Sequence, residues 1–228
     1  MTTARDGLQQ FLDESTRDIS CLKILEAGCG SRSNIRFGDC VHWVGIDISA
    51  AQLDRNVGLS EKIMDDVQVH EFEPSTFDMV VCWDVLEHLK DPEAALVRFA
   101  AATKPGGLIV LKIPNLHSLK GQLTKLLPHG FHVKWYQYIH GRQFTNRVDG
   151  GPFRTYLRRS IAPKALRKFA AHAQLDVPFE GYYDMSSAPW LKRKKPALYA
   201  YKAATFAATV ASFGTLKESE YIIVLRKK

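Results

Sequence analysis

The sequence lacks long apolar runs and lacks the N-terminal pattern of a secretory signal. No stretch reaches the roughly 18 consecutive apolar residues that a membrane-spanning helix requires. Residues 1–6 (MTTARD) contain no apolar core of the kind that a signal peptide needs. We therefore expect a cytoplasmic protein whose contact with a membrane, if it has one, is peripheral and at the inner membrane surface.

Cysteine is scarce, with four among 228 residues, and no spacing of them matches a metal site or a disulfide framework. Three of the four lie in or beside expected strands. Cytoplasmic proteins keep such thiols reduced. The sequence therefore predicts four reduced cysteines, Cys21, Cys29, Cys40 and Cys82.

Acidic residues become scarce after position 115. Residues 1–115 carry 11 Lys/Arg against 18 Asp/Glu, a net charge of −7, whereas residues 116–228 carry 20 against 6, a net charge of +14. The first half suits a cationic or neutral ligand, and the second half suits an anionic partner or surface. A chain of 228 residues fits one domain, or one domain with a large insertion.

The apolar pattern alternates between short buried strands and amphipathic helices up to Asn115, which argues for an α/β, doubly wound sheet. A turn is expected at the KPGG of residues 104–107, and the regular alternation stops after Asn115. Strands are expected at 22–27, 42–47, 62–66, 77–83, 108–113, 176–183 and 220–225, and helices at 5–18, 50–56, 92–103, 163–173 and 196–213.

Two glycines follow the first expected strand. The apolar run 22–27 contains Glu26 and leads into Gly28 and Gly30, and a second run ends at Asp47. This pair is typical of adjacent strands in a nucleotide-binding sheet, whose acid accepts hydrogen bonds from ribose hydroxyls. A dehydrogenase turn needs a third glycine, but Ser33 occupies that position.

Four later motifs accompany this turn, in order: FDMVV at 77–81, DVLEHL at 84–89, DP at 91–92 and KPGG at 104–107. Together they resemble class I S-adenosylmethionine-dependent methyltransferases over residues 20–115. The most similar branch is the small-molecule type that includes the ubiquinone-biosynthesis O-methyltransferases. The resemblance implies a Rossmann-like, seven-stranded sheet, mostly parallel with an antiparallel last strand. It implies one domain over 1–228, with 116–160 as an inserted substrate-side or lid segment and 190–214 as a lid or surface helix.

The resemblance also implies roles in cofactor binding. Asp47, followed by Ile48, would hold the ribose, and Asp66 would face the adenine amine, with Asp65 as the alternative one residue earlier. The chain departs from the family at Arg32, where a glycine is common, and the segment before the second strand is short for a helix, so we expect a more open pocket there. The remaining expected cofactor residues are Glu26, Gly28, Cys29, Gly30, Cys82 and Trp83.

His88 is the candidate general base, because it follows the fourth strand at the carboxyl edge of the sheet, where ligands bind. The alternative is that Glu87 and His88 only cap or orient the following loop. In the ubiquinone branch this Glu-His pair has been linked to a divalent metal. The sequence places no further acids in a cluster beside the pair, so we expect no metal.

The acceptor is expected to contact the basic and aromatic segment 116–168, which holds 11 Lys/Arg and one acid. Such a segment suits an anionic small molecule, RNA or an anionic membrane surface. The Asn/Asp-Pro-Pro-Tyr signature of enzymes that methylate amino groups of bases is missing after the fourth strand. The expected substrate-binding residues are Asn115, His117, Trp135, Tyr136, His140, Arg154 and Tyr156.

The sequence therefore predicts an S-adenosylmethionine-dependent methyltransferase for a small or lipid-linked, anionic acceptor, with oxygen favoured over nitrogen or carbon. An RNA methyltransferase and a non-catalytic cofactor-binding protein are the alternatives. The basic run at 192–195, followed by the apolar helix 196–213, also suits peripheral docking on an anionic membrane, or burial as a lid. The oligomeric state is left open.

Overall fold

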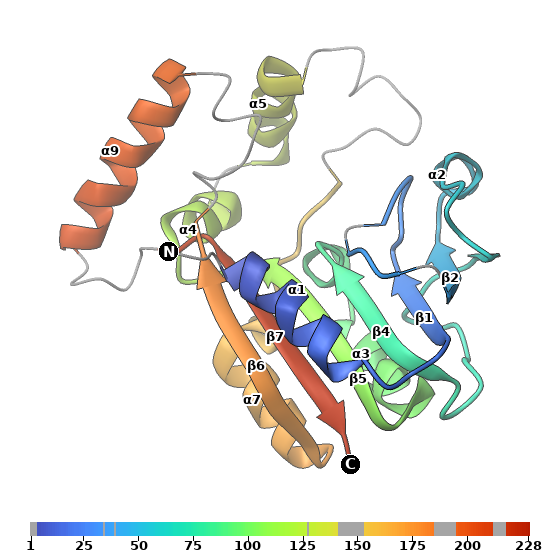
Figure 1. Ribbon diagram of the computed structural model, residues 1–228. Helices are drawn as coiled ribbons and strands as arrows, with labels where there is room; N and C mark the ends of the chain where they lie inside the picture. Colours follow the sequence, from blue (N-terminus) through green and yellow to red (C-terminus); the bar gives the residue numbers. More distant parts are fainter. Residues whose placement is uncertain are drawn as a thin grey trace.

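A computed structural model describes residues 4–33, 35–38, 40–126, 128–140, 153–184, 195–211 and 218–228 (Figure 1). A seven-stranded sheet with the order β3-β2-β1-β4-β5-β7-β6 forms its centre. The strands are β1 (Leu22–Ala27), β2 (Val41–Asp47), β3 (Glu61–Met64), β4 (Phe77–Trp83), β5 (Thr103–Pro114), β6 (Leu175–Tyr183) and β7 (Glu220–Lys227).

Most of the sheet is parallel, as expected. The pairs that join β3, β2, β1, β4 and β5 are all parallel, whereas β7 pairs antiparallel with both β5 and β6. The helices are α1 (Ala4–Ser15), α2 (Ala50–Arg55), α3 (Pro92–Ala102), α4 (Leu119–Leu126), α5 (His129–His140), α7 (Pro163–His172) and α9 (Lys195–Ala211), with 3₁₀ turns η1 (Leu86–His88) and η2 (Arg159–Ile161).

Helices cover both faces of the sheet (Figure 1). Alternate residues of one strand point to opposite faces, and β4 shows this, since Met79 packs on the α1 side with Leu8 and Leu12 while Val80 packs with Phe99 of α3. Because central strands are covered on both faces, they are mostly apolar, as the sequence pattern predicts. The doubly wound arrangement is confirmed.

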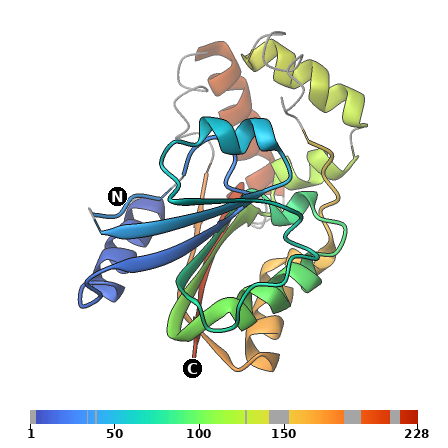
Figure 2. The same cartoon turned by 90° about the vertical axis from the view of Figure 1, so that its right-hand side faces the viewer.

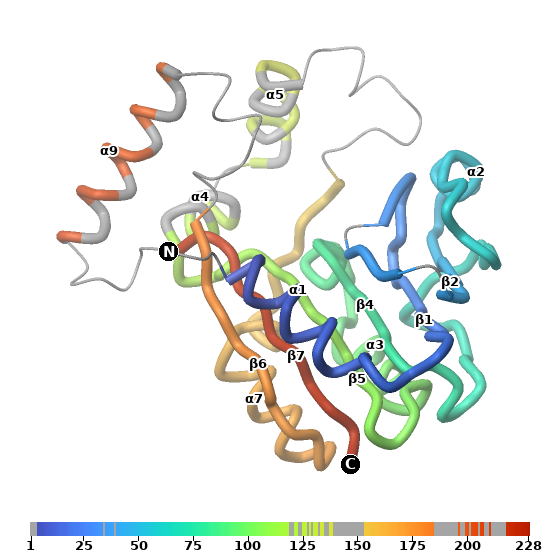
Figure 3. The backbone as a smooth tube through the Cα atoms, viewed as in Figure 1, coloured from blue at the N-terminus to red at the C-terminus, as the bar shows by residue number. Residues whose placement is uncertain are grey.

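The carboxyl ends of β1, β2 and β4 lie at one edge, and α5 and α9 lie beyond that edge in both views (Figures 1 and 2). Two helices, α4 and α5, occupy part of segment 116–160, whose role as an inserted lid stays a prediction. In the backbone trace of Figure 3, β6 and β7 lie side by side, as their antiparallel pairing requires. No helix within the described ranges is long and apolar enough to cross a membrane.

Some expected boundaries were wrong. Strand β5 begins at Thr103 rather than at 108, and the expected turn at 104–107 is an irregularity inside it, where the register shifts between Phe77 and Met79 of β4. Strand β3 ends at Met64, so that Asp65 follows the strand. The segment after the glycine turn, which the sequence gives as short for a helix, has no helix in its described residues 28–33 and 35–38.

The prediction of four reduced cysteines was also wrong. A disulfide joins Cys21 and Cys40, whose Cα atoms are 4.8 Å apart. These residues directly precede β1 and β2, and the parallel register pairs Leu22 with Val41, which brings the two cysteines side by side. Their sequence separation of 19 gives no sign of this strand pairing. Cys29 and Cys82 are buried and free, as predicted.

Candidate active site at the carboxyl edge of the sheet

The sheet order brings residues that are far apart in sequence to one edge. Strands β3, β2, β1 and β4 are neighbours, and the register aligns Ala27 of β1 with Ile46 of β2 and Cys82 of β4. The residues that follow these positions therefore meet at one place, which includes Gly28 and Asp47. In open α/β sheets this edge is where ligands bind.

Asp47 is held by the backbone at the end of β2. Its Oδ2 accepts a hydrogen bond from the Gly30 N–H at 3.0 Å, and its Oδ1 accepts one from the Ser49 N–H at 2.9 Å. A carboxylate offers about four lone-pair sites. Each oxygen therefore keeps acceptor capacity, and the fixed carboxylate fits the two hydroxyls of a ribose.

The glycine turn is required by the protein's own packing. Gly28 and Gly30 have φ of +66° and +53°, in the left-handed region that favours glycine. A Cβ on Gly28 would lie 2.3 Å from Cγ2 of Val85, and one on Gly30 would lie 2.9 Å from Oε1 of Gln52. The turn that follows β1 thus packs directly on the loop that follows β4.

Glu26 is buried beneath this turn, and the Ser33 hydroxyl donates a hydrogen bond to its Oε2. Ser33, which replaces the third dehydrogenase glycine, therefore ties the end of the turn back to β1. Burial raises the pKa of the Cys29 thiol to about 12, and the negative charges of Asp47 and Glu26 add to this effect. The Cys29 thiol is therefore protonated at neutral pH and is not a nucleophile.

The two acids expected to face adenine make other contacts. Both carboxylate oxygens of Asp66 accept hydrogen bonds from the Gln68 side chain, at 3.0 and 2.9 Å. The hydrogen bond from His70, followed by that from the Asp66 N–H, holds the pKa of Asp65 below its usual range. Ile48 exposes 72% of its surface beside Asp47 and offers an apolar surface for a ring. The adenine contact of Asp66, or of Asp65 as its alternative, and the cofactor contact of Ile48 stay predictions.

Cys82 and Trp83 contribute backbone rather than side chains to this edge. Cys82 is fully buried, and burial followed by the charge of Glu87 raises the pKa of its thiol. The Trp83 ring belongs to the core on the α1 side, where the Arg5 guanidinium lies 5.6 Å from its centroid. Contact of Cys82 and Trp83 with the cofactor, which the resemblance implies, stays a prediction.

His88 ends η1, in the loop that follows β4. Its Nδ1 lies 3.0 Å from the carbonyl oxygen of Arg154. Because a carbonyl only accepts hydrogen bonds, this contact assigns the proton to Nδ1 and leaves Nε2 as the basic nitrogen. Burial lowers the His88 pKa and outweighs the Arg154 carbonyl and the Asp84 charge, which raise it. A neutral ring with a basic Nε2 is what a general base requires.

Residues 153–158, which we call the strap, lie against η1. The backbone N–H groups of Tyr156 and Leu157 both donate to the Glu87 carbonyl oxygen, at 2.8 and 3.2 Å. The Leu157 side chain is buried and anchors the strap in the core. The Phe153 ring lies 6.0 Å from the His88 ring. Two of the predicted substrate residues, Arg154 and Tyr156, are thereby brought beside the candidate base.

The other predicted substrate residues are not brought to His88 by any described contact. The Asn115 side chain donates to the Glu218 carbonyl at 2.8 Å and accepts from the His117 N–H at 3.0 Å, so it joins the end of β5 to the start of β7. His117 is exposed. Trp135, Tyr136 and His140 have their backbone in α5, and their side chains lie outside the described part of the structure.

Sequence reasoning missed a buried lysine near this edge. Lys112 of β5 forms ion pairs with Asp84 and Glu220. Burial alone lowers the pKa of Lys112, but the charges of Asp84 and then Glu220 outweigh it and raise that pKa. The available signal was one lysine inside the apolar run of residues 108–113. Among the described residues, no group of three or more His, Cys, Asp or Glu side chains is arranged to hold a metal ion.

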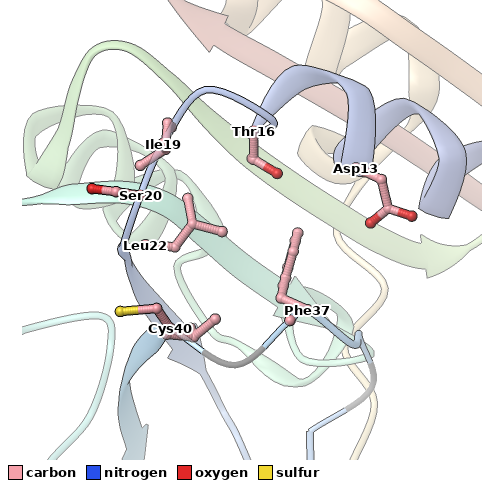
Figure 4. A pocket seen from close by; sticks show the side chains of 9 residues that line it. Asp13, Thr16, Ile19, Ser20, Leu22, Phe37 and Cys40 are labelled. Atoms are coloured by element: carbon pink, nitrogen blue, oxygen red, sulfur yellow. The ribbon is translucent and has the colours of Figure 1, made fainter.

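A pocket of about 270 Å³ lies at the opposite end of the strands (Figure 4). Its lining includes Asp13 and Thr16 from α1 and the following turn, Leu22 at the start of β1, and Phe37 and Cys40 from the loop before β2. This is the amino edge of the sheet, next to the disulfide. The pocket is therefore separate from the glycine turn and from His88.

Comparisons with known proteins agree with this geometry. Residues 2–151 match the family described as a methyltransferase domain. A ubiquinone biosynthesis O-methyltransferase of Hahella chejuensis is 32% identical over 149 residues, which is 57% of this chain and 61% of that protein. One from Coxiella burnetii (strain Dugway 5J108-111) is 29% identical over 150 residues, 58% of this chain and 63% of that protein. The chain thus spans less than two thirds of the length of these relatives.

A solved structure of phosphoethanolamine N-methyltransferase 2 from Haemonchus contortus, in complex with S-adenosyl-L-methionine, superposes with a TM-score of 0.60 at 16% identity. The match covers 97% of this chain and 52% of that one, and it shows the shared fold. With the family match over more than half of its length and a sheet of the same architecture, the chain belongs to the methyltransferase domain family.

Proposed function

We propose that this protein transfers a methyl group from S-adenosylmethionine to an oxygen atom of a small or lipid-linked, anionic acceptor. The observation that carries the proposal is the meeting of the glycine turn, Asp47 and His88 at the carboxyl edge of one sheet. The two curated relatives are both named O-methyltransferases. The family match supports the reaction class.

The cofactor supplies a methyl group made electrophilic by its sulfonium charge. The residues present fit such a group. Asp47 has acceptor capacity for a ribose, the turn at Gly28 and Gly30 allows close backbone approach, and the first half of the chain carries a net charge of −7 that favours a cation. The protein's task is to place the acceptor oxygen in line with the methyl group and to exclude water.

His88 provides the proton acceptor in this proposal. A hydroxyl becomes a better nucleophile when a base takes its proton during attack, which contributes roughly 10² to 10⁴ in rate. Nε2 is unprotonated, since Nδ1 donates to the Arg154 carbonyl. This arrangement supports oxygen as the methylated atom, because an amine needs a base less than a hydroxyl does.

The basic second half supports an anionic acceptor and favours one other candidate, an RNA methyltransferase. Residues 116–228 carry a net charge of +14, and exposed aromatic rings such as Tyr138 and Tyr199 lie on α5 and α9. Both features also suit peripheral contact with an anionic membrane that carries a lipid-linked acceptor. A cytoplasmic location with peripheral contact at the inner membrane surface is part of the same proposal.

The test is an untargeted transfer of tritiated methyl groups from S-adenosylmethionine into fractions of a cell extract. Label in a small-molecule or lipid fraction that disappears with His88→Ala supports the proposal. Label in RNA supports the alternative. Binding of S-adenosylmethionine without label in any fraction supports a non-catalytic binding protein.

A further inference from the structure

Two arginine side chains share one aromatic ring on the strap. The guanidinium carbons of Arg154 and Arg158 lie 5.4 and 5.9 Å from the centroid of the Tyr156 ring. Neither guanidinium forms an ion pair with a carboxylate among the described residues, whereas Arg167 on α7 does pair with Glu180. Two positive charges are therefore gathered at one ring, and no carboxylate of the described residues pairs with either of them.

The position of this pair is fixed by the backbone. The N–H groups of Tyr156 and Leu157 converge on the Glu87 carbonyl, and the Arg154 carbonyl accepts the hydrogen bond from His88. Leu157 has φ of +45°, a left-handed conformation that a leucine adopts only where its surroundings impose it. The strap therefore presents its two arginines at a set place beside the candidate base.

We propose that Arg154 and Arg158, with the ring of Tyr156, bind the anionic group of the acceptor, a carboxylate or a phosphate. Guanidinium groups match both anions through paired N–H donors, and a cation held over a ring is already partly ordered before it binds. Because the strap is bonded to His88, an anion held there places the rest of the acceptor within reach of the base. This inference names the substrate class of the proposed function and rests on it.

A compact anion explains these contacts better than a polymer or a lipid surface. Phosphates along RNA or headgroups in a bilayer are met by charges spread over a broad face. Here two charges converge on one ring, and the segment that carries them is pinned by Glu87 and buried Leu157. The adjacent Arg159 lies in η2 and is exposed, and no ring contact places it at Tyr156, so it serves as a matched control of equal charge.

The experiment measures binding of three aromatic probes by calorimetry to the full chain, with and without S-adenosylhomocysteine. Benzoate and phenyl phosphate carry the two anions, and benzamide is the uncharged analogue of benzoate. We expect the double variant Arg154→Gln/Arg158→Gln to weaken binding of one or both anionic probes at least tenfold, the scale of a lost charge-assisted pair. Arg159→Gln should change the affinity for the anionic probes by less than about twofold, the scale of a weak surface charge. Benzamide should bind weakly to the wild type and to both variants.

Equal loss in Arg159→Gln, no loss in the double variant, or benzamide binding as tight as benzoate would each overturn the inference. The inference would also be overturned if the double variant bound the aromatic probes as well as the wild type does but lost binding to phosphatidylglycerol vesicles or to single-stranded RNA. The titrations with S-adenosylhomocysteine test the proposed function separately. A chain that binds the anions through these arginines but binds no S-adenosylhomocysteine refutes the methyltransferase proposal and leaves the anion site standing.

Discussion

Replacing Asp47 with alanine removes the carboxylate that we assign to the ribose. In the structure this group is already fixed by the N–H groups of Gly30 and Ser49, so its two oxygens meet a ligand without reordering. A hydrogen bond to a charged group contributes about 1.5–3 kcal/mol. Two ribose hydroxyls, with some compensation by water, give an expected loss of about 2–4 kcal/mol, or roughly 30- to 700-fold in affinity at 1.4 kcal/mol per tenfold.

The assay is calorimetric titration of S-adenosylhomocysteine into the wild type and into Asp47→Ala. The matched control is Asp54→Ala, which removes an exposed carboxylate from the neighbouring helix α2 and so causes the same change in net charge. We expect the control to change affinity by less than about twofold, because exposed charges act weakly at a distance. Thermal melting checks that both variants fold.

An unchanged affinity in folded Asp47→Ala would refute the assignment of the cofactor to this edge. An equal loss in both variants would show that only the net charge matters. Asparagine is a poor substitute here, because one of its two polar atoms would be an amide nitrogen facing the backbone N–H of Gly30 or Ser49.

Three further predictions follow from the contacts described above. If His88 is the base, its lowered pKa means that the active, neutral form of the ring persists below pH 6.5. His88→Gln should then lower kcat by roughly 10²-fold or more and abolish the acidic limb of the pH–rate profile. Initial rates measured at several pH values test both effects. The double variant Cys21→Ser/Cys40→Ser should lower the free energy of unfolding by about 3 kcal/mol, the scale for a closed loop of this length, and should lower the melting temperature. Reduction of the wild type should lower the free energy of unfolding by the same amount. Lys112→Met should lower the free energy of unfolding in urea by about 3–5 kcal/mol, because the Glu220 carboxylate then stays buried without the lysine cation. Adding Glu220→Gln to this variant should recover part of the lost stability, and no recovery would contradict the ion pair.

The sheet was predictable because its strands carry their own signal. Strands β1 and β4 are mostly apolar, with charged residues only at Lys23 and Glu26 of β1 and Asp78 of β4, and the structure places them at the expected residues 22–27 and 77–83. The positions of the candidate residues at the strand ends were predictable for the same reason. A residue at the end of a parallel strand is placed by the strand itself, as Gly28 and Asp47 show.

Contacts between segments far apart in sequence were not predictable. The disulfide depends on the register of β1 against β2, and the Lys112–Glu220 ion pair depends on β7 inserting beside β5, which no local pattern shows. Arg154 and Tyr156 were named for their chemistry within a basic, aromatic segment. Their place beside His88 depends on the strap bonding to the Glu87 carbonyl, 69 residues earlier than Tyr156 in the chain.

The contact between Gly28 and Val85 has a consequence for the order in which ligands bind. Val85 directly precedes η1, which ends at His88, and His88 is bonded to the strap through Arg154. A cofactor seated on the turn at Gly28 would therefore brace the loop that carries the proposed base and is bonded to the strap. We expect sequential kinetics in which the cofactor binds first. The affinity for the acceptor should then be higher in the cofactor-bound enzyme, and bound acceptor should raise the affinity for the cofactor by the same factor.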